Sequence, residues 1–200
     1  MNFKDFKHIV LNTRCTRRFK SDIKIDKSEL EELVDVARQV SSAKNLQPLR
    51  YIIITDESIK HKVYKPLVWA SNLPNWSQKD SEKPSAYILV LNDSSIDGFS
   101  EVDSGIAMQT IVLGAKTKGI SSCIMASIDK EEYQKIFKLK KDIKPIFIIA
   151  LGIADETVKL KDVKNNITNY YRDKNDNHIV PKRVFKDIVL SEKPLEKENI

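Results

Sequence analysis

Hydrophobic positions along this chain follow two spacings, one typical of amphipathic helices and the other of short buried strands. The helical spacing predicts helices at residues 2–11, 26–40, 63–69, 103–118 and 129–137. Apolar runs of strand length occupy residues 51–55, 86–91 and 146–152, and residues 121–127 (SSCIMAS) are typical of a strand followed by a turn. Helices and strands alternate irregularly, with long excursions between them. This order favours an α+β fold with a mixed sheet over a doubly wound α/β fold.

Two features of these helices add detail. Asp26 with Glu29, and Asp129 with Glu132, have the spacing of a capping box, which predicts a helix start at each aspartate. The 103–118 helix has so little polar circumference that we expect it to be buried in the core or in a subunit contact.

The chain length favours one domain over residues 1–190, with a polar C-terminal tail at 191–200. Residues 165–186 show no clear period and are rich in Lys, Asp and Asn. Because this segment is long and polar, we expect it not to fold on itself but to lie along another surface or another subunit. It holds a basic trio of Arg172, Lys182 and Arg183.

The composition, with 41% hydrophobic and 31% charged residues, is typical of a globular protein with a charged surface. No apolar run is long enough to cross a bilayer and the N-terminus lacks a signal-peptide core, so we expect a cytoplasmic protein without membrane contact. The net charge of +6 favours anionic partners, but the basic residues are mixed with acidic ones, which argues against nucleic acid. Cys15 and Cys123 lack metal-ligand spacing, which argues against structural zinc or a disulfide framework.

Three arginines, Arg14, Arg17 and Arg18, lie within five positions of one another after the first predicted helix. The planar guanidinium group matches phosphate with two hydrogen bonds and stays charged at any working pH, so the segment is a candidate phosphate clamp. Phe19 would anchor it to the core. Taken alone, the segment could also be a charged connector, or the nucleic-acid contact of a non-enzymatic binding protein.

A second polar cluster precedes the 51–55 strand. Ser42, Asn45 and Gln47 fall in the turn between a helix and a strand, where ligands often bind. Asn and Gln carry both donors and an acceptor without charge, which suits recognition of a heterocycle. Pro48 favours an extended conformation at Gln47. A solvated loop is the alternative interpretation.

Other chemistry lacks the necessary residues. Cys15 has no acid–base pair near it in sequence, and His8, His61 and His178 are isolated, so we predict no catalytic side chain and no metal site. With five glycines in the chain, neither a dinucleotide-binding fingerprint nor a P-loop is present. An arginine cluster, an amide-rich turn and a basic C-terminal trio are the parts needed to hold a phosphorylated, ring-bearing cofactor that supplies its own chemistry.

Four motifs together resemble the FMN-dependent nitroreductase family. Residues 13–19 (TRCTRRF) are similar to its arginine-rich opening motif, and residues 41–48 (SSAKNLQP) to its Pro-Ser-x-x-Asn-x-Gln-Pro turn. Residues 103–109 (DSGIAMQ), followed by 119–123 (GISSC), resemble the start of its long central helix and the strand after it. Residues 180–183 (VPKR) match its basic C-terminal element. The motifs occur in the family's order over nearly the whole chain.

The resemblance implies a nitroreductase-like α+β fold with a mainly antiparallel central sheet flanked by helices, in an intertwined homodimer. It further implies that FMN is the only redox centre and lies at the dimer interface. FMN would take hydride from NADH or NADPH and reduce a small planar electrophile, such as a nitroaromatic or a quinone, by a ping-pong route. The implied cofactor-binding residues are Arg14, Cys15, Arg17, Lys182 and Arg183 at the phosphate and ribityl end, Ser42, Asn45 and Gln47 from the other subunit at the ring, and Met125 and Ala126 through backbone contacts.

Three positions differ from the family pattern. Cys15 replaces a Ser, Ser41 a Pro and Leu49 a Trp. A thiol is a weaker hydrogen-bond partner than a hydroxyl, so the Cys15 position bears directly on the expected phosphate contact. The alternative within the fold is a flavoprotein with another task, namely dehalogenation, ring dehydrogenation or flavin breakdown.

Overall fold

The computed structural model describes residues 1–73, 76–163 and 167–190, and the chain divides into two units. The main unit comprises Met1–Ser71 and Trp76–Glu156. The C-terminal unit comprises Thr157–Ile200 with Asn72–Asn75. The expectation of one domain over residues 1–190 stays a prediction, and the tail at 191–200 lies outside the described residues.

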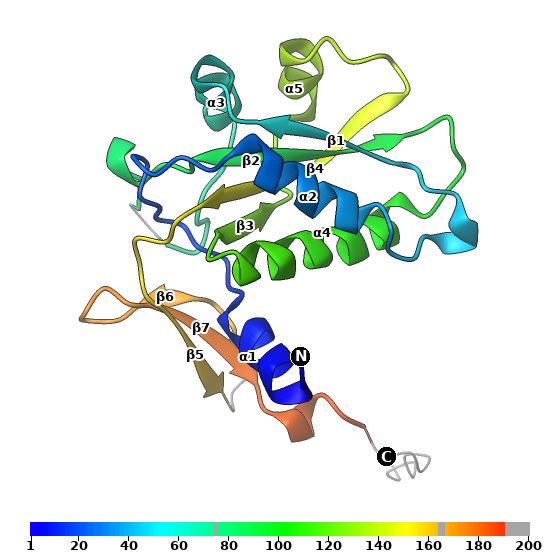
Figure 1. Cartoon of the computed structure of the whole chain (residues 1–200). Coiled ribbons are helices and arrows are strands. Elements are labelled where there is room, and N and C mark those ends of the chain that lie inside the picture. The colour runs from blue at the N-terminus through cyan, green and yellow to red at the C-terminus, as the bar shows by residue number, and fades with distance from the viewer. Residues whose placement is uncertain (74–75, 164–166, 191–200) are drawn as a thin grey trace, which may run out of the picture. The chain divides into compact units, whose positions relative to one another are not determined.

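A four-stranded antiparallel sheet forms the centre of the main unit, in the order β1-β2-β4-β3 (Figure 1). Its strands are β1 (Leu49–Ile54), β2 (Ala86–Asp93), β3 (Ser121–Met125) and β4 (Ile143–Gly152). Strand β2 pairs with β1 along one edge and with β4 along the other, and its apolar side chains are buried on both faces of the sheet. Every one of the predicted strands is present, and the α+β class is confirmed.

Helices cover both faces of this sheet (Figure 1). The main-unit helices are α1 (Phe3–Asn12), α2 (Lys27–Ala37), α3 (Glu57–Tyr64), α4 (Ser100–Thr117) and α5 (Lys130–Ile136). Helices α2 and α4 pack on one face, against Ile88 and Val90 of β2. Helices α3 and α5 pack on the other, against Tyr87 and Leu89. The alternation of side chains along β2 therefore divides the core into two layers.

Four predicted helix ends differ from the structure by three residues or more. Helix α4 begins three residues before Asp103, α2 ends at Ala37 instead of Val40, and α3 spans Glu57–Tyr64 instead of 63–69. Pro66 explains the early end of α3, because proline has no backbone N–H with which to continue a helix. Asp26 precedes α2 as predicted, but its side chain makes no capping hydrogen bond. The second capping aspartate, Asp129, accepts from the Glu132 amide at 2.9 Å.

The C-terminal unit corrects the expectation that residues 165–186 do not fold on themselves. Strands β5 (Val158–Val163), β6 (Tyr171–Arg172) and β7 (His178–Arg183) form a small sheet in the order β5-β7-β6. Strand β7 pairs in parallel with β5 and antiparallel with β6. Strand β5, which supplies much of the pairing, lies before residue 165. The pattern within residues 165–186 therefore could not reveal this sheet. Residues 165 and 166 lie outside the described part of the chain.

Candidate functional site

The arginine segment, residues 13–20, follows α1 and crosses the end of β3. The Thr16 amide donates to the Ser122 carbonyl oxygen at 2.9 Å, and Cys15 forms a parallel β-bridge with Ser122. Phe19 is fully buried and its amide donates to the Glu82 carbonyl oxygen, so the predicted anchor is confirmed. The segment is thus held against β3 at Cys15 and Thr16, and against the short 3-10 helix Asp80–Glu82 at Phe19.

Arg14 keeps donor capacity for a ligand. Its Nη2 donates to the Val10 carbonyl oxygen at 2.6 Å, whereas its buried Nε has no hydrogen-bond partner among the described residues. Buried guanidinium nitrogens without partners are rare, since leaving them unpaired costs free energy. The Glu156 carboxylate accepts from the backbone amides of Arg17 and Arg18, which fixes the backbone that carries both guanidinium groups. These features fit a phosphate group, which would supply acceptors to Arg14.

Cys15 and Cys123 lie side by side, although they are far apart in sequence. Both are free thiols; Cys15 is exposed and Cys123 is buried in the core. The Cys123 side chain hydrogen-bonds to Cys15, and this bond is the largest of the effects that lower the pKa of the Cys15 thiol to about 6. The positive charges of Arg17 and Arg14 act in the same direction, while the partial loss of water around the thiol on folding opposes them. The pKa of Cys123 is correspondingly raised by the hydrogen bond and by its burial.

The amide turn, residues 41–48, is held by a carboxylate of α4. Asp103 is 2% exposed and accepts from the Ser42 hydroxyl at 2.5 Å and from the Ala43 amide at 3.0 Å. The Ser42 oxygen accepts in turn from the Gln47 amide at 2.9 Å. Because Asp103 lies in the first turn of α4, the helix dipole favours its negative charge. Asp103 therefore fixes the geometry of the turn.

The backbone of the amide turn is strained. Lys44, Asn45 and Gln47 have φ angles of 53°, 55° and 52°, in the left-handed region that residues other than glycine rarely adopt. The extended conformation that Pro48 predicted at Gln47 is therefore wrong, because the hydrogen bond from the Gln47 amide to Ser42 holds the turn in this shape. Gln47 Nε2 donates to Asn45 Oδ1 at 3.1 Å, and both side chains are exposed. Among the described residues, Asn45 Nδ2 and Gln47 Oε1 have no partner, so a donor and an acceptor stay available side by side. Strain of this kind is concentrated at ligand sites.

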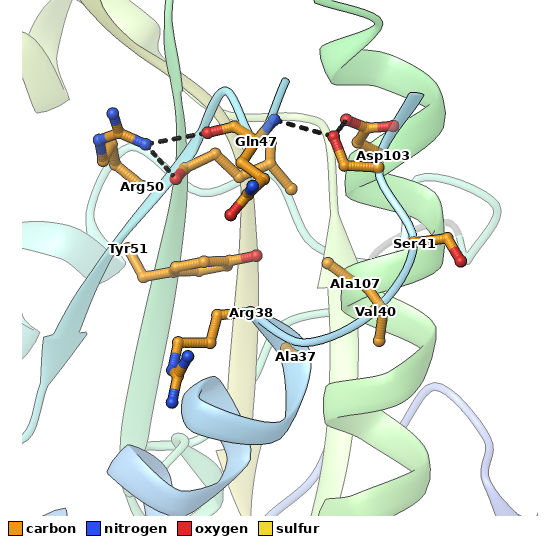
Figure 2. A pocket seen from close by; sticks show the side chains of 11 residues that line it. Ala37, Arg38, Val40, Ser41, Gln47, Arg50, Tyr51, Asp103 and Ala107 are labelled. Atoms are coloured by element: carbon orange, nitrogen blue, oxygen red, sulfur yellow. Dashed lines mark hydrogen bonds between the residues drawn. The ribbon is translucent and has the colours of Figure 1, made fainter. Parts of the chain in front are cut away.

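A pocket of about 190 Å³ lies next to this turn (Figure 2). The Gln47 side chain points toward the Tyr51 ring, and Arg38 and Arg50 lie on the same side of the pocket. Burial, with a smaller effect from Asp103, raises the pKa of Tyr51 to about 12, so its hydroxyl group stays protonated. The lining residues are Ala37, Arg38, Val40, Ser41, Ser42, Gln47, Leu49, Arg50, Tyr51, Asp103 and Ala107.

The other predicted site residues lie in two places. Met125 ends β3 and Ala126 follows it; β3 is an edge strand of the main sheet, and in the described chain its outer edge pairs only at the Cys15 bridge. Ligands can bind to backbone groups at such an edge. Lys182 and Arg183 are exposed residues of β7 in the C-terminal unit. Their part in a phosphate site stays a prediction.

The arginine segment and the amide turn of one chain lie at opposite ends of α4. The turn is bonded to Asp103 in the first turn of the helix, and the arginine segment to Ser122, which follows its end. At 1.5 Å per residue the helix separates the two ends by about 20 Å. The structure therefore does not bring the two halves of the predicted site together within a single chain.

Comparison with known proteins identifies the family. The sequence model of the Nitroreductase family matches residues 10–153, and the chain therefore belongs to this family. A Bacillus subtilis protein provisionally named NAD(P)H nitroreductase YodC is 23% identical over 186 residues, covering 72% of this chain and 88% of that protein. The iodotyrosine deiodinase of Thermotoga neapolitana is 23% identical over 177 residues, covering 79% and 92%.

A solved structure has the same fold. A provisionally assigned nitroreductase from Exiguobacterium sibiricum 255-15, crystallised in complex with FMN, superposes with a TM-score of 0.63. It is 20% identical and the match covers 78% of this chain and 91% of that one. The nitroreductase-like α+β fold expected from the sequence motifs is thereby confirmed.

Three residues of the candidate site could not be assigned from the sequence. Asp103 was part of a helix motif, but its hydrogen bonds to the amide turn were not predicted. Cys123 appeared only as the last residue of the 119–123 motif, with no sign of its contact with Cys15, and Glu156 carried no signal at all. A contact between distant segments leaves no trace in local spacing. In the parts of the chain that the structure describes, no group of acidic, histidine or cysteine residues could hold a metal ion. None of the described helices is long and apolar enough to span a membrane.

Proposed function

We propose that this protein is an FMN-dependent oxidoreductase that uses NADH or NADPH to reduce a small planar electrophile, such as a nitroaromatic or a quinone, by a ping-pong route. Membership of the Nitroreductase family and the FMN found in a protein of the same fold support this proposal. The observation that carries it is the buried Nε of Arg14 beside Cys15 and Arg17, which has no hydrogen-bond partner among the described residues and would gain one from a phosphate.

The proposed FMN site is shared by two copies of the chain. A phosphate and a flavin ring are joined by a ribityl chain of a few bonds of about 1.5 Å each, which is well short of the 20 Å or so between the two ends of α4. In a homodimer, the arginine segment of one subunit can meet the amide turn of the other. The phosphate end would then be held by Arg14, Cys15 and Arg17, and the ring by Ser42, Asn45 and Gln47 of the second subunit.

Exposed apolar side chains support the homodimer. Helix α1 is amphipathic but has no buried residue, and its Phe3 is 78% exposed. On α4, Val102 is 60% exposed and Ile106 is 41% exposed. Large exposed apolar groups of this kind mark surfaces that are covered in an assembly. The 103–118 helix was expected to be buried in the core or in a subunit contact. Its Ala107, Ile111 and Ala115 lie in the core of the main unit, and the exposed Ile106 is available for a subunit contact as well.

Within such a site, each group of this chain has a physical task. The guanidinium groups of Arg14 and Arg17 would neutralise the phosphate, and the free edge of β3 at Met125 and Ala126 would offer backbone hydrogen bonds to the ring. Asn45 Nδ2 and Gln47 Oε1 would hydrogen-bond the ring edge, held in place by the Asp103 network. Bound FMN would supply the two-electron transfer between nicotinamide and acceptor.

The second candidate function is a different task on the same fold. The similarity to an iodotyrosine deiodinase favours dehalogenation among the alternatives. The two functions differ in their acceptors: the proposed enzyme turns over NAD(P)H with a nitroaromatic or a quinone, whereas a dehalogenase releases halide from a halogenated phenol and shows little turnover with the other acceptors.

Reconstitution with FMN tests the cofactor. The purified chain should gain the yellow flavin absorbance when mixed with FMN, and Arg14→Ala should weaken FMN binding roughly 10- to 150-fold, because hydrogen bonds to charged groups contribute about 1.5–3 kcal/mol. Lys24→Ala, which removes an exposed positive charge elsewhere, is the matched control. A protein that gains no flavin absorbance at any FMN concentration would refute the proposal.

Subunit mixing tests the shared site. Arg14→Ala and Asn45→Ala should each bind FMN poorly alone. After the two variants are unfolded, mixed and refolded, half of the dimers are mixed, and each of these has one intact site, so roughly a quarter of all sites should recover tight binding. No recovery would show that both residues act within one chain.

A further inference from the structure

Cys15 and Cys123 are the two cysteines of this chain, and Cys123 has no role in the proposed FMN site. The two residues come from different segments. Cys15 bridges Ser122, the neighbour of Cys123, across adjacent strands. With strands about 4.8 Å apart and about 3.3 Å per residue along a strand, the Cα atoms of Cys15 and Cys123 are separated by about 6 Å. This separation lies within the range that a disulfide requires.

The two side chains are also close together, because each thiol shifts the pKa of the other: the pKa of Cys15 is lowered and that of Cys123 is raised. The two thiols differ in the way that a stepwise oxidation needs. Cys15 is exposed and lies next to two guanidinium groups, so it can react with a solute, whereas Cys123 is 3% exposed and cannot. An exposed thiol near positive charge is the usual site of attack, and a neighbouring protected thiol resolves the product.

We infer that Cys15 and Cys123 are a redox-active dithiol, in which Cys15 reacts with hydroperoxides and Cys123 then closes an intramolecular disulfide. In the first step the Cys15 sulfur attacks the peroxide, the O–O bond breaks, and a sulfenic acid and an alcohol or water form. In the second step the Cys123 sulfur attacks the Cys15 sulfur, the S–O bond breaks, and water leaves with the Cys123 proton. In total, two thiols and one hydroperoxide give one disulfide, one alcohol and one water.

The lowered pKa of Cys15 supports the first step, because the thiolate is the reactive form and is already populated near neutral pH. The location of the pair suggests a consequence for the cofactor, which rests on the proposed function. A phosphate held by Arg14 and Arg17 would cover Cys15 and disfavour its thiolate by charge repulsion. Bound FMN should therefore slow the oxidation, so that the pair responds to peroxide mainly when the cofactor is absent.

Mass spectrometry of the intact full-length chain tests the pair. The FMN-free protein is reduced, freed of reductant, treated with hydrogen peroxide at pH 7, and then unfolded in N-ethylmaleimide. The expected product is about 2 Da lighter than the reduced chain and takes up no maleimide. After reduction with dithiothreitol it should take up two maleimide groups. Cys123→Ser should instead stop at a sulfenic acid on Cys15 that dimedone traps, and Cys15→Ser should leave Cys123 unmodified.

Two results would overturn the inference. In one, the wild-type chain gains oxygen atoms on Cys15 while Cys123 still takes up maleimide. In the other, the disulfide joins two chains, as a dimer band on a non-reducing gel. FMN protection is measured separately, as at least a tenfold slower loss of thiols in FMN-saturated protein. If the reduced chain binds no FMN, the proposed function fails while the dithiol chemistry can still be observed.

Discussion

The buried carboxylate of Asp103 provides the sharpest test of how the amide turn is held. In Asp103→Ala, the Ser42 hydroxyl and the Ala43 amide both lose their acceptor. Each hydrogen bond to a charged group contributes about 1.5–3 kcal/mol. Water can reach the partly exposed turn and replace some of the lost hydrogen bonding. We therefore expect the free energy of unfolding to fall by about 3–4 kcal/mol. Asp103→Asn keeps one acceptor oxygen and should lose only about 1–2 kcal/mol.

Urea unfolding of the FMN-free protein, at one fixed protein concentration, measures this effect without the linkage that a ligand introduces. With an m-value of roughly 2 kcal/mol/M, the midpoint for Asp103→Ala should fall by about 1.5–2 M. Thr110→Ala is a matched control on the same helix, since its hydroxyl bonds only to the Ile106 carbonyl oxygen at 3.0 Å, and should change stability by less than about 0.5 kcal/mol. Equal midpoints for the two variants would refute the role assigned to Asp103.

Three further substitutions or conditions test other parts of the structure. Gly152→Ala should cost about 1–3 kcal/mol in urea unfolding, because the added Cβ would lie 2.7 Å from Phe19 Cδ1 in the core. Tyr133→Phe should cost about 1 kcal/mol by the same assay, since the buried hydroxyl donates to the Val63 carbonyl oxygen at 2.8 Å. Alkylation of Cys15 should rise with a midpoint near pH 6 in the folded protein, because its pKa is lowered to about 6, and near pH 8.5 after unfolding. A folded-state midpoint at or above 8 would contradict the close contact with Cys123, and Cys123→Ala should move the folded midpoint upward.

Local patterns were sufficient for much of the main unit. The apolar stripe of α2 and the buried run of β2 appear within windows of a dozen residues, where the period of the side chains is set by the helix or strand itself. The arginine segment and the amide turn were likewise visible, because Arg, Asn, Gln and Pro have distinct chemistry at short spacing. The order of the four family motifs then predicted the fold class, which the comparisons confirm.

Contacts between distant segments explain what those patterns missed. Strands β5 and β7 pair although neither has a strong apolar alternation. Helix α3 ends early because of a proline, which a prediction from apolar spacing alone does not take into account. The bond from Asp103 to Ser42 and the contact of Cys15 with Cys123 join residues that local spacing cannot relate. These residues become neighbours only when the chain folds, because the tertiary structure brings α4 next to the amide turn and the arginine segment next to β3. Side-chain chemistry could be recognised one segment at a time, whereas the partners of each group depended on the packed arrangement.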